Sequence, residues 1–184
     1  MIAFPTRAKL ESWLRKHHKT EKELWVRIYK KDSGTPSVTW EDCVVAGIAW
    51  GWIDGHKKSL DTVSFLQRMT PRRPKSGWSK KNTEHAERLI AEGRMQKAGL
   101  EHVEAARADG RWSQAYAGSK DMVIPEDFVR ALKRNRRASA FYKTLNRANQ
   151  FAIYHRLATA KTEATRTKRI ESILARLESG KAFH

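Results

Sequence analysis

Aliphatic residues alternate with aromatic and charged ones over residues 24–29, the run Leu-Trp-Val-Arg-Ile-Tyr. A period of two is typical of a β-strand with one face turned to a core. Two more strand-like runs, residues 53–59 and 63–69, are joined by a short polar turn and are expected to form a hairpin. Together the three runs predict a small antiparallel sheet of three strands.

Elsewhere the apolar residues recur at helical spacing. Thr6 precedes one such run, and Thr39 followed by Asp42 has the form of a capping box that opens a second helix. Ser79 opens a third, and residues 95–108 form a fourth that ends at a glycine. Helices are therefore expected before the sheet, between its strands and after it.

The last third of the chain predicts helices alone. Ile124-Pro125-Glu126-Asp127 is a helix start, with proline early and acidic residues in the first turn. Three helical patterns follow it, ending before Gly180. The sequence thus predicts an α+β fold with two parts: residues 1–122 as an α+β domain, and residues 123–184 as a basic helical region that packs on the first.

Length and composition limit the class of protein. A chain of 184 residues with seven tryptophans can bury one proper core. Its single cysteine, Cys43, excludes an intrachain disulfide, and the N-terminus becomes polar too soon for a signal peptide. No apolar run reaches the roughly 18 residues of a membrane span. We expect a cytoplasmic protein without a membrane span; its oligomeric state is left open.

The net charge of +17 is unevenly placed, because residues 1–82 and 128–184 are basic and the middle is mildly acidic. Such a balance favours an anionic partner, which includes nucleic acid, an acidic protein or a phosphorylated ligand. The alternative is a basic surface that serves solubility alone.

Residues 50–82 combine tryptophans, glycines, prolines and the densest run of cations. Five cations surround the predicted helix start at Ser79, although a helix N-terminus favours anions. A bound phosphate, sulfate or carboxylate would explain them. The predicted ligand-binding residues are Trp52, Asp54, Arg72, Arg73, Ser76, Trp78, Ser79 and Asn82.

Several of these residues also have a structural interpretation. Ser79 can simply cap its helix, Trp78 can belong to the core, and the cations can point into water or pair with Asp54 and Asp61. Asp54 can form an ion pair with Arg72 or Arg73, or act as general base in an enzyme acting on a phosphorylated small molecule. No second carboxylate accompanies Asp54 at short range, so the sequence favours a binding protein over an enzyme.

Other chemistry has little support in the sequence. Cys43 lies in an apolar helical pattern without a nearby histidine, which favours a core position. His56 has no partners at metal-ligand spacing, and no glycine loop for nucleotides is present, so no cofactor or metal is predicted. Lys168, Arg169 and Arg176 lie on the polar side of the last helix, which leaves non-specific nucleic-acid binding as an alternative function.

Several motifs in the chain resemble those of one protein family. They are Lys30-Lys31, Gly51-Trp52-Ile53-Asp54-Gly55, Thr70-Pro71-Arg72-Arg73, Ser76, Trp78-Ser79, Asn82, Gly93-Arg94-Met95, Asp109-Gly110-Arg111-Trp112, Ala115-Tyr116, Lys161, Arg166 and Arg169-Ile170. Over residues 4–180 the chain resembles the YdeI/OmpD-associated family of small bacterial proteins. The resemblance implies a link to bacteriocin protection, to stress resistance against cationic antimicrobial peptides and to an outer-membrane porin. It brings no catalytic residue with it.

Overall fold

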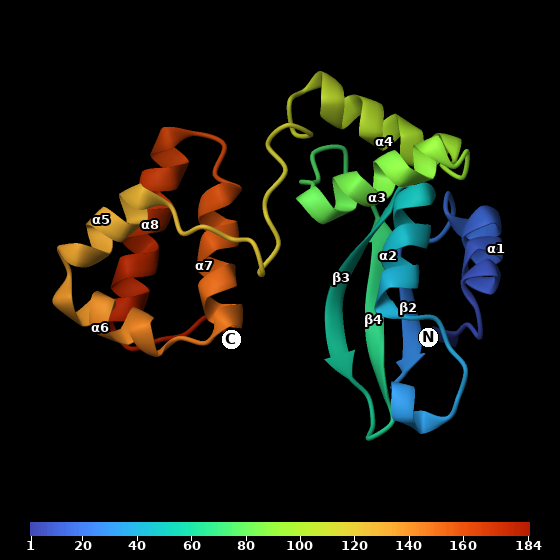
Figure 1. The fold of residues 1–184 in the computed structure, drawn as a ribbon, viewed down its shortest axis with the longest axis horizontal. Coiled ribbons are helices and arrows are strands. Elements are labelled where there is room, and N and C mark those ends of the chain that lie inside the picture. The colour runs from blue at the N-terminus through green and yellow to red at the C-terminus, as the bar shows by residue number, and fades with distance from the viewer. The chain divides into compact units, whose positions relative to one another are not determined.

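The computed structural model describes all residues from Met1 to His184 and divides them into two compact units, Met1–Ala115 and Tyr116–His184. The first unit contains a sheet and four α-helices (Figure 1). Its elements are β1 (Ile2–Ala3), α1 (Arg7–His17), β2 (Leu24–Tyr29), the short 3-10 helix η1 (Lys31–Ser33), α2 (Trp40–Ala49), β3 (Trp52–Ser59), β4 (Ser64–Pro71), α3 (Lys80–Ala91) and α4 (Lys97–Ala108). The α+β class is therefore confirmed.

The sheet has four strands, in the order β1-β2-β4-β3. The predicted strands appear as β2, β3 and β4, with β4 antiparallel to both others, but β1 adds a parallel pair with β2 in which Ile2 lies opposite Val26. The prediction of a purely antiparallel three-stranded sheet was wrong in this respect. Two residues are too few to show any alternation, so β1 exists only because the chain passes beside β2.

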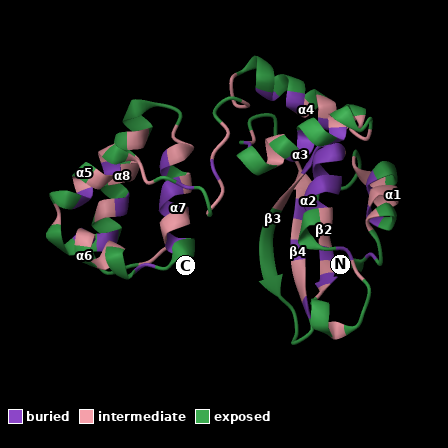
Figure 2. Cartoon of the chain, viewed as in Figure 1, coloured by how far each residue is buried: buried purple, intermediate pink, exposed green.

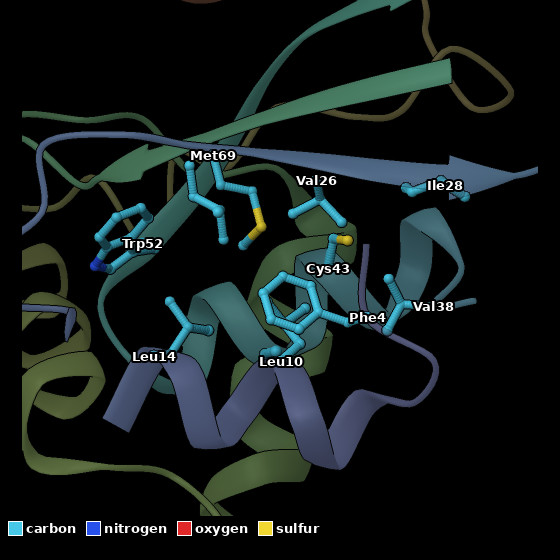
Figure 3. Close-up of a cluster of buried hydrophobic side chains, with 11 residues drawn as sticks. Phe4, Leu10, Leu14, Val26, Ile28, Val38, Cys43, Trp52 and Met69 are labelled. Atoms are coloured by element: carbon cyan, nitrogen blue, oxygen red, sulfur yellow. The ribbon is translucent and has the colours of Figure 1, made fainter. Parts of the chain in front are cut away.

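Helices cover one face of this sheet. Figure 3 shows Val26 of β2 and Met69 of β4 pointing toward Leu10 and Leu14 of α1. Cys43 of α2 and the ring of Trp52 belong to the same apolar cluster. The alternation of β2 thus assigns its aliphatic residues to the core.

A second apolar cluster joins α2 to α3 and α4. Figure 2 shows how completely α2 is buried, while β3 at the sheet edge is mostly exposed. The backbones of α2 and α4 approach closely, since a Cβ on Gly99 would lie 2.4 Å from the carbonyl oxygens of Ile48 and Ala49. Only glycine fits there without a shift of one helix.

The predicted helix starts are confirmed by their caps. Thr6 accepts the backbone N–H of Lys9, Ser79 that of Asn82, and Thr39 forms the complete capping box with Asp42. These hydroxyl and carboxylate oxygens satisfy backbone donors that a helix start leaves without partners.

The second unit is helical: α5 (Glu126–Lys133), α6 (Arg136–Thr144), α7 (Arg147–Ala158) and α8 (Glu163–Glu178). Four helices stand where three were predicted, because one pattern is interrupted at Leu145, whose backbone is extended, and Asn146 caps α7. One apolar cluster draws on all four helices, with Phe128 and Leu177 among its buried residues. No helix in the structure has the length and apolar character to cross a membrane.

Candidate functional site

Three of the eight predicted ligand-binding residues are buried. Trp52 belongs to the first core, where its indole N–H donates to the carbonyl of His18 at 3.1 Å. Arg72 is 5% exposed, with its guanidinium 3.7 Å from the centre of the Trp78 ring and one N–H donating to the carbonyl of Gly77. These contacts fix the fold of residues 72–79 and leave little of Arg72 or Trp78 for a ligand.

Asp54 has a different partner from the one expected. Its carboxylate accepts the indole N–H of Trp40 at 3.1 Å, and it forms no ion pair with Arg73. In register Asp54 lies opposite Met69, on the helix-covered side of the sheet, whereas Ile53 lies opposite Thr70 on the other side. The structure therefore separates Asp54 from Arg73.

At the start of α3, Ser79 and Lys81 already have partners within the protein. Ser79 accepts the N–H of Asn82 at 3.2 Å, so the hydroxyl serves as a helix cap. Lys81 lies 4.0 Å from Glu41, and its ammonium group is 5.7 Å from the centre of the Trp40 ring. The helix cap therefore accounts for Ser79, and the solvated ion pair accounts for Lys81, one of the cations that the sequence predicted to hold an anion.

Arg73 and Ser76 do line a hollow in the surface, an open cleft of about 560 Å³ that we call the basic cleft. It lies where β4 ends and where the chain enters β2. Its lining residues are Lys19, Thr20, Glu21, Lys22, Ile53, Arg68, Thr70, Pro71, Arg73 and Ser76.

The charge of the basic cleft is positive and largely uncompensated. Arg68 is paired with Glu23 at 2.8 Å, but Lys19, Lys22 and Arg73 form no ion pair and are exposed. Glu21 is the one acidic residue in the lining. The hydroxyl of Ser76 accepts the backbone N–H of Arg73 at 3.1 Å, so its own proton points elsewhere and is available to donate. Such a set of donors is suited to an anion.

Sequence reasoning missed Lys19, Lys22 and Arg68 of this cleft. Lys19 and Lys22 precede β2, more than forty residues before Arg73, and only the pairing of β2 with β4 brings the two segments together. Arg68 lies on β4 opposite Trp25. The sequence shows that all three residues are basic, but their closeness in space depends on how the strands of the sheet pair.

Two reactive side chains outside the cleft, Cys43 and His102, are buried and half-buried respectively. Cys43 is completely buried in the first apolar cluster, which confirms a core position, and this burial, with the charges of Asp42 and Asp54, raises the pKa of its thiol to about 12. Burial also lowers the pKa of His102, and the charges of Arg72 and Arg111 lower it further. No group of three or more His, Cys, Asp or Glu side chains in the structure could hold a metal ion.

The basic residues of α8 are partly engaged in their own unit. Arg169 donates to the carbonyl of Arg156 at the end of α7, and Arg176 donates twice to the carbonyl of Ala182 while stacking on Phe183. Lys168 alone of the three is exposed without such a role. Of the three cations predicted to follow a nucleic-acid backbone, Arg169 therefore links α8 to the end of α7, and Arg176 holds the C-terminal segment in place.

Comparison with protein families gives two matches. Residues 2–102 match the family model described as Domain of unknown function (DUF8412), which is more than half of the chain. The chain belongs to the DUF8412 family. Residues 121–180 match a second model, described as bacteriocin-protection, YdeI or OmpD-associated.

The second match confirms the resemblance to the YdeI/OmpD-associated family for residues 121–180, a shorter stretch than the predicted 4–180. The DUF8412 region contains the whole sheet and every residue of the basic cleft. The YdeI/OmpD-associated region contains α5 to α8. No curated protein and no solved structure gives a match to the chain.

Proposed function

We propose that this DUF8412 protein binds an anionic group, a phosphate or a carboxylate, in the basic cleft. The observation that carries the proposal is that Lys19, Lys22 and Arg73 line one hollow without an acidic partner. Cations that have no internal partner and share a cleft attract a ligand of opposite charge. The proposed ligand is anionic, as predicted from the sequence, but its proposed site is this cleft and not the start of α3.

The chemistry of the lining favours phosphate within that class. Arg73 offers a planar fork of N–H donors that matches two oxygens of a phosphate or carboxylate. Lysines act as mobile point charges, and Ser76 and Thr70 add neutral hydroxyl donors. Arg72 and Trp78 act indirectly in this proposal, because their stacking at 3.7 Å fixes the turn that carries Arg73 and Ser76.

The match of residues 121–180 supports a link of the whole protein to bacteriocin protection. We propose that anion binding by the first unit serves such a protective role and that it takes place in the cytoplasm. The proposal assigns no catalytic role to Asp54, because its carboxylate lies on the sheet face opposite to the basic cleft.

A thermal-shift titration with inorganic phosphate, pyrophosphate and citrate tests the proposal. A ligand at ten times its Kd stabilises the folded state by about 1.4 kcal/mol, which raises the Tm of a chain of this size by about 3–5 °C. Arg73→Ala and Lys22→Ala should each reduce the shift, and the double variant should abolish it. Lys133→Ala, which removes an exposed lysine from α5, is the matched control and should leave the shift unchanged. The absence of a shift with all three anions, or an undiminished shift in the double variant, would refute anion binding at the cleft.

A further inference from the structure

The sheet has a second face that carries aromatic residues and no helix layer. This face carries Trp25 and Tyr29 of β2, Ile53 of β3 and Leu66 of β4. Along each strand these residues alternate with core residues, whose side chains lie on the opposite face of the sheet. None of the four belongs to any of the apolar clusters of the molecule. We call this surface the open face.

The open face runs directly into the basic cleft. Ile53, Arg68 and Thr70 line the cleft and are also residues of the open face, and Arg68 lies opposite Trp25 in the strand register. From Thr70 to Ser64 at the other end of β4, the face is about 20 Å long. A ligand held in the cleft can therefore extend along the aromatic residues without leaving the surface.

Two arginines that are held by ion pairs lie beside the rings of the open face. Arg27 stacks on Tyr29 at 4.6 Å while donating to Asp61 at 2.7 Å and to Ser64 at 3.0 Å. Arg68 beside Trp25 is held by Glu23. The Tyr29 ring, fixed in this way, offers a stacking surface at little cost in conformational entropy on binding.

Cations lie at both ends of this surface. Lys19, Lys22 and Arg73 occupy the end at the cleft, and Lys30 and Lys58 lie near the hairpin end without an ion pair. A second copy of the chain laid on the open face would bring basic ends together in either direction. The charge pattern favours a polyanion that also carries flat apolar groups.

We infer that the open face binds single-stranded nucleic acid, with a phosphate in the basic cleft and unpaired bases on Trp25 and Tyr29. The inference rests on the proposed anion binding and names the class of its ligand. Exposed bases stack on aromatic residues of an open sheet, whereas a duplex hides the faces of its bases. The length of the face corresponds to a few nucleotides.

Fluorescence anisotropy with the full-length protein tests the inference, using a labelled oligothymidylate of about 12 nucleotides, an abasic oligomer of equal length and a duplex. The oligothymidylate should bind at least about tenfold more tightly than the abasic oligomer, because each stacked base contributes to affinity. Trp25→Leu should remove this preference, and Trp25→Phe should retain most of it. Trp40→Leu is the control, since Trp40 is 43% exposed on α2, away from the open face.

The cleft variant gives an independent readout. Arg73→Ala should weaken binding of the oligothymidylate and of the abasic oligomer alike, and should reduce the slope of log K against log salt concentration by about 1. Tyr29→Leu serves as a second stacking variant if Trp25→Leu fails to fold, as judged by circular dichroism.

The outcomes separate the two proposals. Equal affinity for the abasic oligomer or the duplex, or unchanged binding by both stacking variants, overturns base stacking and leaves anion binding standing. If phosphate produces no thermal shift in the parent protein, anion binding itself is overturned. A dimer in sedimentation analysis that Trp25→Leu converts to monomer would show that a second copy covers the face, which also overturns the inference.

Discussion

The two faces of the sheet are built from the same strands but differ in how deeply their side chains are buried. On the covered face, Val26 and Met69 are completely buried against α1 and α2. On the open face, Trp25 and Leu66 remain half-buried and pack into no apolar cluster. The comparison teaches that alternation tells which residues share a face, while packing against helices decides which face becomes core. Residue type alone does not separate the faces, since Trp52 is buried on the covered face and Leu66 lies on the open face.

The largest expected difference between the two faces is in thiol reactivity. Cys43 on the covered side has a pKa of about 12 instead of 9.0, so its thiolate is about a thousandfold scarcer at pH 8. Ellman's reagent should therefore react with the folded protein at least about a thousand times more slowly than with a Thr70→Cys, Cys43→Ala variant, whose thiol lies on the open face. Both proteins should react at equal rates in denaturant. Fast reaction of Cys43 in the folded state would show that the covered face opens readily.

A smaller difference is expected in stability. Met69→Ala should lower the free energy of unfolding by about 2–5 kcal/mol, because the side chain is fully buried and a cavity remains. Leu66→Ala, three residues away on the same strand and on the open face, should cost only about 1 kcal/mol. Urea denaturation of the two variants measures both values. Equal losses would mean that Leu66 is packed as tightly as Met69.

The smallest expected effect concerns pH. Burial lowers the pKa of His85 on α3, with further contributions from Arg88 and Lys81. As pH falls through about 6.5, His85 takes up a proton in the unfolded chain but not in the folded chain. The contribution of neutral His85 to the free energy of unfolding is therefore fully present above that pH and decreases toward pH 5. His85→Gln should reduce the fall of Tm between pH 7 and pH 5.

Asp61 on the open-face side provides the contrast. Hydrogen bonding from Ser64 lowers the pKa of its carboxyl, so its contribution is present above about pH 3.9 and is lost only as pH falls below that value. Asp61→Asn should therefore leave the change of Tm between pH 7 and pH 5 as it is in the parent protein. If it alters that change as much as His85→Gln does, the assignment to His85 is wrong.

Local signals in the sequence predicted most of the first unit. Thr39, Ser79 and the alternation in β2 report on their immediate neighbours, and the structure confirms the elements that they predicted. The site was harder to predict, because a cluster of cations along the chain is not a cluster in space. Arg72 and Arg73 are adjacent, yet one is buried under Trp78 and the other lies exposed in the cleft. Which of two neighbours turns inward depends on packing that local patterns do not encode.

The exposed edge of β3 has a consequence for how the protein behaves at high concentration. The strand register shifts between Asp54 and Lys57, and Lys57 and Lys58 follow the irregularity. A strand of another molecule that approached this edge would meet a distorted row of backbone groups and two ammonium ions. This edge is therefore a poor template for a strand of another molecule, even though the neighbouring surface displays tryptophan and tyrosine rings to solvent.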